Sequence, residues 1–177
     1  MLAPSEPPAV LGIAAGQLLG PMTTLEVGGP ARYFGAPRDE ATLIAMIHWG
    51  RACQAPLVVL GGGSNIVISD AGLQALVIRP HLTDLGTWEK GDRVLLDAGA
   101  GICWDALAKH AAECGLWGLE CLSGIPGSVG ATPIQNVGAY GHEVGEYIDP
   151  EAFPSEQDTT PMQVGDYLDP DSDFTGD

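Results

Sequence analysis

The sequence predicts an α+β protein with a small α/β unit in the first half of the chain. One observation is the order of apolar patterns between residues 31 and 79, which reads strand, helix, strand, loop, strand, strand. The other is glycine, with 25 residues among 177, twice the fraction of roughly 7% that is usual in proteins. The glycines gather directly after apolar runs, so we expect loops whose backbone approaches another group closely.

The elements of this unit follow from local patterns. Residues 31–36 read as a short strand, and residues 39–53 read as a helix because apolar side chains recur at helical spacing. Asp39 suits the first turn of that helix, and Pro56 ends it. The continuous apolar run 57–60 predicts a strand that is buried on both faces.

Further along the chain, residues 66–68 and 75–79 are predicted to be strands, and so are residues 93–98. Residues 104–114 are predicted to form a helix, which Gly115 would end. From Gly118 to Gly145 the chain has little regular pattern, and long irregular segments in compact domains are often functional.

Charge separates the body of the chain from its end. The formal net charge is −16, and nine of the 23 acidic residues lie in residues 149–177, which hold no lysine or arginine. With its prolines and lack of periodicity, this segment is expected to be a disordered acidic tail. Residues 1–20, rich in proline and alanine, are expected to be a loose arm. The charge argues against nucleic acid or an anionic membrane as partner.

Cysteine and histidine spacing predicts neither a disulfide framework nor a metal site. The four cysteines form no C-x-x-C pair, and the four histidines show no ligand spacing. Arg32 is the first basic residue, so a signal peptide is not indicated, and the apolar stretch from Ala9 to Leu19 is too short to span a bilayer. These features favour a cytoplasmic protein with reduced thiols.

Two glycine loops follow predicted strands. Gly61, Gly62, Gly63, Ser64 and Asn65 offer backbone N–H groups and two polar side chains that could converge on a phosphate or diphosphate. A plain glycine turn is the alternative. The segment 99–104 begins like a dinucleotide fingerprint but has Trp104 where a small residue is needed, so a strand end that turns into a helix competes with that reading.

The densest glycine segment runs from Gly124 to Gly141. Its glycines leave much of the backbone uncovered, and hydrogen-bonding side chains stand between them. Such a segment could lie against a flat ligand with polar edges, such as a flavin. The alternative is a glycine-rich loop of low stability.

In combination, these motifs resemble a known family, the UDP-N-acetylenolpyruvoylglucosamine reductases (MurB), in their N-terminal part. The resemblance covers about residues 20–148. The motifs that carry it, in chain order, are Thr23-Thr24-Leu25-Glu26-Val27-Gly28-Gly29-Pro30-Ala31, Gly61-Gly62-Gly63-Ser64-Asn65, Gly99-Ala100-Gly101, Gly118-Leu119-Glu120, Gly124-Ile125-Pro126-Gly127-Ser128-Val129-Gly130-Ala131 and Gln135-Asn136-Val137-Gly138-Ala139-Tyr140-Gly141.

The resemblance implies an FAD-binding fold of the vanillyl-alcohol-oxidase (PCMH) type, with two small α/β subdomains at residues 21–85 and 86–148, the second one truncated. It implies FAD as cofactor, NADPH as electron donor, and a nucleotide-sugar substrate whose enolpyruvyl group is reduced to give UDP-N-acetylmuramate in peptidoglycan synthesis. By motif, the cofactor-binding residues would be Gly61, Gly62, Gly63, Ser64, Asn65, Gly124, Ile125, Pro126, Gly127, Ser128, Gly130, Gln135, Asn136, Gly138, Ala139, Tyr140 and Gly141.

The family's catalytic motifs are not found downstream. The family uses an arginine, a serine and a glutamate from later segments, whereas here no basic residue follows Lys109. No catalytic residue is therefore predicted, and we expect the chain alone to be catalytically incomplete. A non-catalytic FAD-binding remnant and an interaction module with an acidic tail are the alternatives, together with another oxidase of the same flavoprotein superfamily.

Overall fold

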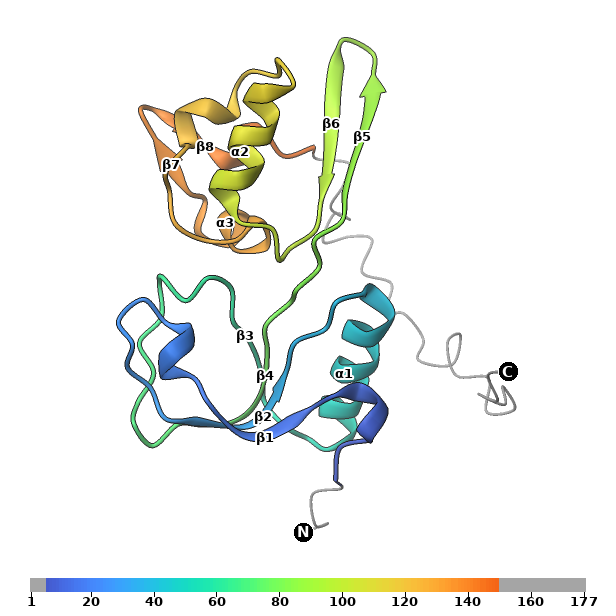
Figure 1. The fold of residues 1–177 in the computed structure, drawn as a ribbon, viewed down its shortest axis with the longest axis vertical. Helices are drawn as coiled ribbons and strands as arrows, with labels where there is room; N and C mark the ends of the chain where they lie inside the picture. The colour runs from blue at the N-terminus through green and yellow to red at the C-terminus, as the bar shows by residue number, and fades with distance from the viewer. Residues whose placement is uncertain (1–5, 150–177) are drawn as a thin grey trace, which may run out of the picture. The chain divides into compact units, whose positions relative to one another are not determined.

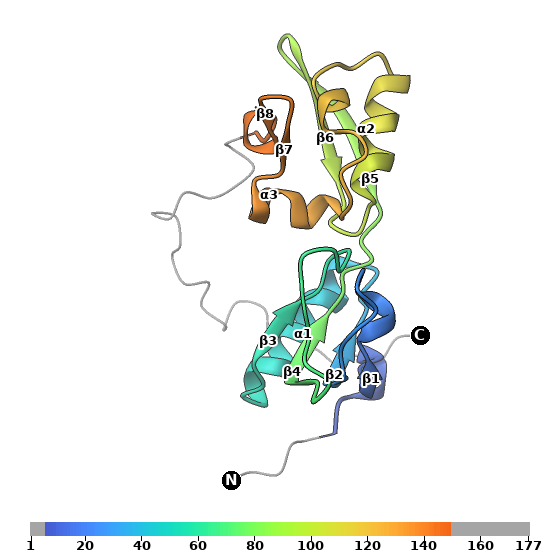
Figure 2. The same cartoon turned by 90° about the vertical axis from the view of Figure 1, so that its left-hand side faces the viewer.

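Four strands form a mixed sheet in the first half of the chain. The structure is a computed structural model that describes residues 6–149. The strands lie in the order β1-β2-β4-β3, with β4 parallel to both β2 and β3 and β1 antiparallel to β2 (Figure 2). Their bounds are Ala14–Leu18 for β1, Pro30–Gly35 for β2, Leu57–Val59 for β3 and Leu73–Ile78 for β4. The predicted mixed α/β architecture is confirmed.

Helix α1 (Glu40–Ala52) connects β2 to β3 and covers one face of this sheet (Figure 1). It begins after Asp39, whose carboxylate accepts hydrogen bonds from the backbone N–H of Thr42 at 2.7 Å and from its hydroxyl at 2.9 Å. These hydrogen bonds lower the pKa of Asp39 below its ordinary value of 3.8. Gly35 lets the helix approach β2, because a Cβ there would lie 2.5 Å from the sulfur of Met46.

The sheet has an apolar core on each face, as the alternation of side chains along a strand requires. On the helix face, Leu76 and Ile78 of β4 pack with Tyr33 and Met46. On the other face, Val77 of β4 packs in a second cluster, whose other buried members are Leu19, Ala31, Phe34, Leu60 and Ile68. Strand β4 is therefore the buried centre of this sheet.

The second half of the described chain is built around a hairpin and a helix. Strands β5 (Leu85–Lys90) and β6 (Arg93–Ala98) pair antiparallel across a two-residue turn, in which Gly91 has φ +65°. Helix α2 (Trp104–Glu113) lies beside β6 (Figure 1) and contributes Trp104 and Leu107 to a third apolar cluster.

Short elements follow α2 in the segment for which no regular pattern was predicted. Antiparallel strands β7 (Gly138–Ala139) and β8 (His142–Glu143) are joined by a tight turn, and helix α3 (Thr132–Gln135) precedes them. This segment also has 3₁₀ turns at Leu119–Leu122, Val129–Ala131 and Val144–Glu146. Two further 3₁₀ turns lie near the start of the chain, at Ala9–Leu11 and Gly20–Met22.

Several predicted elements are confirmed, and two predictions of local structure were wrong. The helices at 39–53 and 104–114 and the strands at 31–36, 75–79 and 93–98 match α1, α2, β2, β4 and β6. Residues 66–68 do not form a strand, because they pair with no other strand of the described residues, although Ile68 packs into the core. Strand β3 is an edge strand among the described residues and is not buried on both faces, since it pairs only with β4 there and Leu57 and Val59 are exposed.

The expected loose arm, residues 1–20, is also corrected. Residues 14–18 form β1, which extends the sheet by pairing with β2, and Leu19 is fully buried. Strand β5 was not predicted, because all six of its residues are exposed and its sequence lacks an apolar run.

Residues up to Tyr147 form one compact unit, and a second unit begins at Ile148. The predicted acidic tail, 149–177, lies outside the described residues except for Asp149. Within residues 6–149, no helix is long and apolar enough to cross a membrane, and no group of three or more possible ligands could hold a metal ion.

Candidate functional site

The carboxyl ends of the parallel strands bring two loops to one edge of the four-stranded sheet. Strands β3 and β4 are neighbours and run in the same direction, so the chain leaves both of them at that edge. The loop Gly61–Asn65 follows β3, and Arg79 and His81 follow β4. In open α/β sheets, ligands bind in the crevice outside the carboxyl ends of the strands.

Hydrogen bonds hold the chain in place as it leaves these strands. The N–H of Leu60 donates to the carbonyl of Ile78 at 2.8 Å, which extends the pairing of β3 with β4. The N–H of Arg79 donates to the carbonyl of Gly35 at 2.9 Å, which continues the pairing of β4 with β2. Both loops therefore start from fixed backbone.

Gly63 shapes the loop after β3. Its φ of +75° favours glycine, and a Cβ there would overlap the carbonyl oxygen of Met22. The N–H of Thr24 donates to the carbonyl of Gly63 at 3.0 Å. The neighbouring Thr23 is buried, and its hydroxyl lies 3.0 Å from the carbonyl oxygen of Gly20. Thr23 and Thr24 thus hold the backbone of the glycine loop in position at Gly63.

The glycine segment 127–130 is held against the loop that precedes α2. The N–H of Val129 donates to the carbonyl of Ile102 at 2.9 Å, and the N–H of Gly130 donates to the carbonyl of Ala100 at 3.1 Å. A Cβ on Gly130 would lie 2.6 Å from the Cβ of Ala100, so only glycine allows this approach.

Asp105 fixes the start of the same glycine segment. Its carboxylate oxygen accepts from the N–H of Gly124 at 2.6 Å and from the hydroxyl of Ser123 at 2.8 Å. These two hydrogen bonds lower the pKa of Asp105 below its ordinary value of 3.8, and the one from the backbone of Gly124 contributes most. Because Asp105 lies in the first turn of α2, the helix positions the segment.

The glycine loop after β3 and the segment 127–130 meet at a cleft. A Cβ on Gly62 would lie 3.1 Å from the Cα of Gly127, so the two backbones pass each other with no room for side chains. On one side of this contact is a cavity of about 200 Å³. Its walls are Val59, Leu60, Gly61, Gly62, Gly63, Ser64, Asn65, Ile66, Pro80, Ala100, Ser128, Gly130, Ala131, Ile134 and Gln135.

A second cavity of about 190 Å³ shares Gly61, Gly62, Pro80 and Ser128 with the first. Its remaining walls are Arg79, His81, Gly101, Cys103 and Gly127. Among residues 6–149, no aspartate or glutamate lies in the walls of either cavity. A cleft lined by glycine backbone and free of carboxylates suits an anionic ligand.

The structure brings together part of the predicted site. Nine of the predicted residues lie in the walls of the two cavities: Gly61, Gly62, Gly63, Ser64, Asn65, Gly127, Ser128, Gly130 and Gln135. The others lie outside these walls: Gly124, Ile125, Pro126, Asn136, Gly138, Ala139, Tyr140 and Gly141. Ile125 and Ala139 pack against the third apolar cluster instead.

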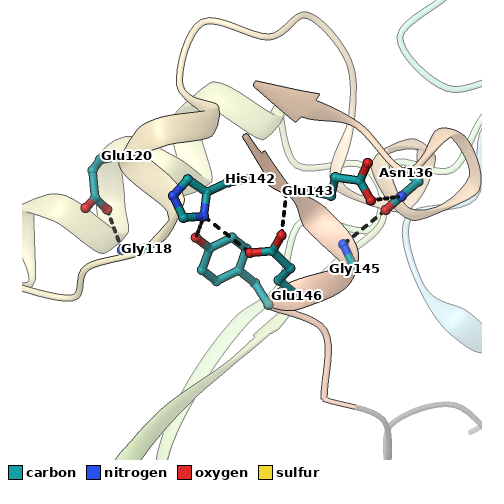
Figure 3. Close-up of polar contacts among 8 residues, drawn as sticks. Gly118, Glu120, Asn136, His142, Glu143, Gly145 and Glu146 are labelled. Atoms are coloured by element: carbon teal, nitrogen blue, oxygen red, sulfur yellow. Dashed lines mark hydrogen bonds and ion pairs between the residues drawn. The ribbon is translucent and has the colours of Figure 1, made fainter. Parts of the chain in front are cut away.

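Asn136 uses its amide to hold the chain that follows it. Its carbonyl oxygen accepts from the N–H of Gly145 at 3.2 Å, and its NH₂ group donates to the carboxylate of Glu143 (Figure 3). Asn136 has φ +43°, which lets it end α3 in the left-handed region. Both ends of its side chain are therefore engaged within the protein.

A polar cluster lies beside this turn (Figure 3). The Nδ1 of His142 is 3.1 Å from the hydroxyl of Tyr147 and 3.2 Å from a carboxylate oxygen of Glu146. A neutral Nδ1 cannot accept from Tyr147 and donate to Glu146 at once, so these two contacts are alternatives. Desolvation, and then the charge of Glu146, raise the pKa of Tyr147 above its ordinary value of 10.0.

Sequence reasoning missed the residues that follow β4. Arg79 and His81 come from a strand with no glycine motif after it, so no local signal marks them. The parallel pairing of β3 and β4 could have found them, because parallel neighbours end at one edge. Ile134 was missed for a similar reason, since it is a single apolar residue that is 82% exposed.

Comparison with known proteins identifies the family of the chain. A family model described as an FAD binding domain matches residues 31–149, about two thirds of the chain. The chain belongs to this family of FAD binding domains. Its fold is the FAD-binding fold that the resemblance implied.

Individual relatives show which members of this family the chain is similar to in sequence. The chain is 47% identical over 134 residues to a UDP-N-acetylenolpyruvoylglucosamine reductase of Saccharopolyspora erythraea, covering 75% of this chain and 37% of that protein. It is 45% identical over 136 residues to the protein of the same name in Mycolicibacterium smegmatis, covering 77% and 36%. The chain therefore corresponds to the N-terminal, FAD-binding part of such reductases and spans about a third of their length.

A solved structure supports the same relationship. The crystal structure of UDP-N-acetylenolpyruvylglucosamine reductase (MurB) from Thermus caldophilus matches with a TM-score of 0.56 and 37% sequence identity. The match covers 71% of this chain and 43% of that one. Homology to MurB is thus found in both sequence and structure.

Proposed function

We propose that this chain binds FAD at the cleft between the glycine loop after β3 and the segment 127–135. In a complete enzyme it would serve as the FAD-binding part of a reductase that uses NADPH to convert UDP-N-acetylenolpyruvoylglucosamine to UDP-N-acetylmuramate. The observation that carries the proposal is the close passage of Gly62 and Gly127, which leaves two backbone-lined cavities at the carboxyl ends of parallel strands.

The residues at the cleft suit the two chemical parts of FAD. Val59, Ile66 and Ile134 give the first cavity apolar walls, which favour a flavin ring. The backbone of Gly61 and Gly62 can donate N–H groups to phosphate oxygens without any net positive charge. When bound, FAD would accept hydride from NADPH and pass it to the substrate.

Ser64 and Asn65 are exposed at the start of the first cavity and can donate to a ligand there. Gln135 lies at its other wall, on α3, and can do the same. Thr23, Asp105 and Asn136 would act differently, because they hold the loops that form the cleft. We therefore expect substitutions of Ser64, Asn65 or Gln135 to weaken FAD binding directly. Substitutions of the three residues that hold the loops should weaken it by moving those loops.

The test is flavin binding by the purified 177-residue chain. We expect flavin absorbance in the purified protein and saturable quenching of FAD fluorescence on titration. Gly62→Leu should abolish both, because its side chain would fill the space beside Gly127. Gly86→Leu is the matched control, since Gly86 lies on exposed β5 and a Cβ there makes only ordinary contacts, the nearest at 3.6 Å. A wild-type chain that does not bind FAD would overturn the proposal.

We also expect no reductase turnover from this chain alone. The sequence holds no lysine or arginine after Lys109, so it offers no cation beyond that point to engage the diphosphate of a nucleotide sugar. NADPH oxidation that depends on the enolpyruvyl nucleotide sugar, measured with FAD-loaded chain, would contradict this expectation. FAD binding without turnover would fit both a FAD-binding part of a reductase and a non-catalytic FAD-binding module.

A further inference from the structure

Arg79 is a positively charged residue in the wall of the second cavity. It is the one lysine or arginine among the residues that line the two cavities, and it is partly buried at the end of β4. Its own N–H is bonded to Gly35, which fixes the backbone from which the side chain starts. Among residues 6–149, the guanidinium has no ion pair or hydrogen bond to another side chain.

The walls around Arg79 differ from those of the neighbouring cavity. The second cavity combines Arg79 and His81 with the backbone of Gly61, Gly62 and Gly101 and has no leucine, isoleucine or valine in its walls. The first cavity has four such residues, Val59, Leu60, Ile66 and Ile134. A ligand with an apolar ring and a charged linker would therefore place the ring in the first cavity and the charge in the second.

The distribution of charge around the cleft also favours an anionic group in the second cavity. The first 148 residues carry seven more acidic than basic residues, yet none of the carboxylates in the described part of the chain lines either cavity. Within residues 6–149 no side chain pairs with the guanidinium of Arg79, and the partial burial of this charge costs little free energy only if an anion or water satisfies it. Its planar fork of N–H groups matches two phosphate oxygens at once, which a lysine would not do.

Resting on the FAD binding proposed above, we propose that Arg79 binds the diphosphate of the dinucleotide in the second cavity. This contact makes the protein selective for FAD over flavins that lack a diphosphate. The backbone N–H groups of the glycine loop position the phosphates, and Arg79 supplies the single positive charge that offsets them.

The experiment compares three ligands across wild type, Arg79→Gln, Arg79→Lys and Arg51→Gln. Arg51 is an exposed arginine in the last turn of α1, so Arg51→Gln makes the same charge change away from the cleft. Binding of FAD, riboflavin and ADP is measured by titration in the full-length chain. Arg79→Gln should weaken FAD and ADP binding about ten- to a hundredfold, as expected for one charge-assisted hydrogen-bonding group.

Riboflavin binding and the lysine variant separate a contact with the diphosphate from a structural role of Arg79. Riboflavin affinity should change less than about twofold in Arg79→Gln, Arg79→Lys should restore part of the FAD affinity, and the salt dependence of FAD binding should fall in Arg79→Gln. Equal FAD affinity in Arg79→Gln and wild type would overturn the role of Arg79 alone. Equal loss of FAD and riboflavin would also overturn it, by showing a structural effect. A wild-type chain that binds neither flavin would overturn the proposed function itself.

Discussion

Single glycines determine how closely the backbones approach at the candidate site. Gly63 combines a left-handed backbone with a contact that excludes any side chain, whereas a Cβ on Gly86 would make only ordinary contacts, the nearest at 3.6 Å. The enrichment in glycine therefore has different causes at different positions, and only the structure separates them.

Replacing Gly63 by alanine should destabilise the chain and weaken FAD binding. The left-handed conformation costs about 1–2 kcal/mol for a residue with a Cβ, and overlap with the Met22 carbonyl adds to this. Thermal unfolding of Gly63→Ala and of the control Gly86→Ala checks the prediction. A melting temperature for Gly63→Ala equal to that of the control would contradict it.

Asp105 predicts a dependence of stability on pH. Its pKa is lower in the folded chain than its ordinary value of 3.8, because Gly124 and Ser123 donate to the charged form. The stabilisation is therefore fully present above about pH 4 and is lost as pH falls below 3.8 through the lowered folded pKa. Urea unfolding of wild type and Asp105→Asn should differ at pH 7 and converge near pH 2. A constant difference across that range would rule the prediction out.

At the scale of elements, α2 is the support of the second half of the described chain. Trp104 in its first turn is buried, and its indole N–H donates to the carbonyl of Leu122 at 2.8 Å. Asp105 in the same turn holds Gly124. Hairpin β5–β6 packs on this cluster only through Leu96 and Ala98 of β6, and a lone two-stranded hairpin is marginally stable. The helix therefore determines where the glycine segment that begins at Gly124 lies.

Trp104→Phe should lower the free energy of unfolding by about 1–3 kcal/mol, because it leaves the buried Leu122 carbonyl without its donor. Trp88→Phe is the matched control, since Trp88 on β5 is 49% exposed, and such a surface change should stay within about 0.5 kcal/mol. Urea unfolding measures both. Equal midpoints for the two variants would show that the hydrogen bond to Leu122 contributes nothing.

At the scale of the whole molecule, ligand and fold should stabilise each other. The cleft is formed by the glycine loop after β3 and by the segment 127–130, which are far apart in the sequence, and a ligand that contacts both favours the folded state only. Saturation with FAD should therefore stabilise residues 6–147 as a unit. The chain spans about a third of the length of its curated relatives, so FAD binding is the part of their activity that it can be tested for.

FAD at 100 times its dissociation constant should add about 2.7 kcal/mol of stability. For a chain of this size, that corresponds to a rise in melting temperature of about 5–10 °C. Differential scanning fluorimetry without an added dye, or circular dichroism, measures the shift, and riboflavin should give a smaller one. No shift with FAD, in a chain that unfolds cooperatively, would contradict the prediction.

The sequence by itself determined the local elements and the family. Helices α1 and α2 were predictable because their capping residues and apolar spacing are local, and the order of glycine motifs was enough to indicate an FAD-binding fold. These features depend on neighbours within a few residues, or on motifs that can be read directly.

Tertiary structure determined which strands pair and which residues lie at the cleft. Residues 14–18 became a strand because β2 offered an edge, and β3 proved to be an edge strand because of the strand order. Arg79 reached the cleft because β4 runs parallel to β3, and Asn136 turned its amide to Gly145. Each of these outcomes depends on pairing between segments far apart in sequence, and no local pattern encodes which strand will lie beside which.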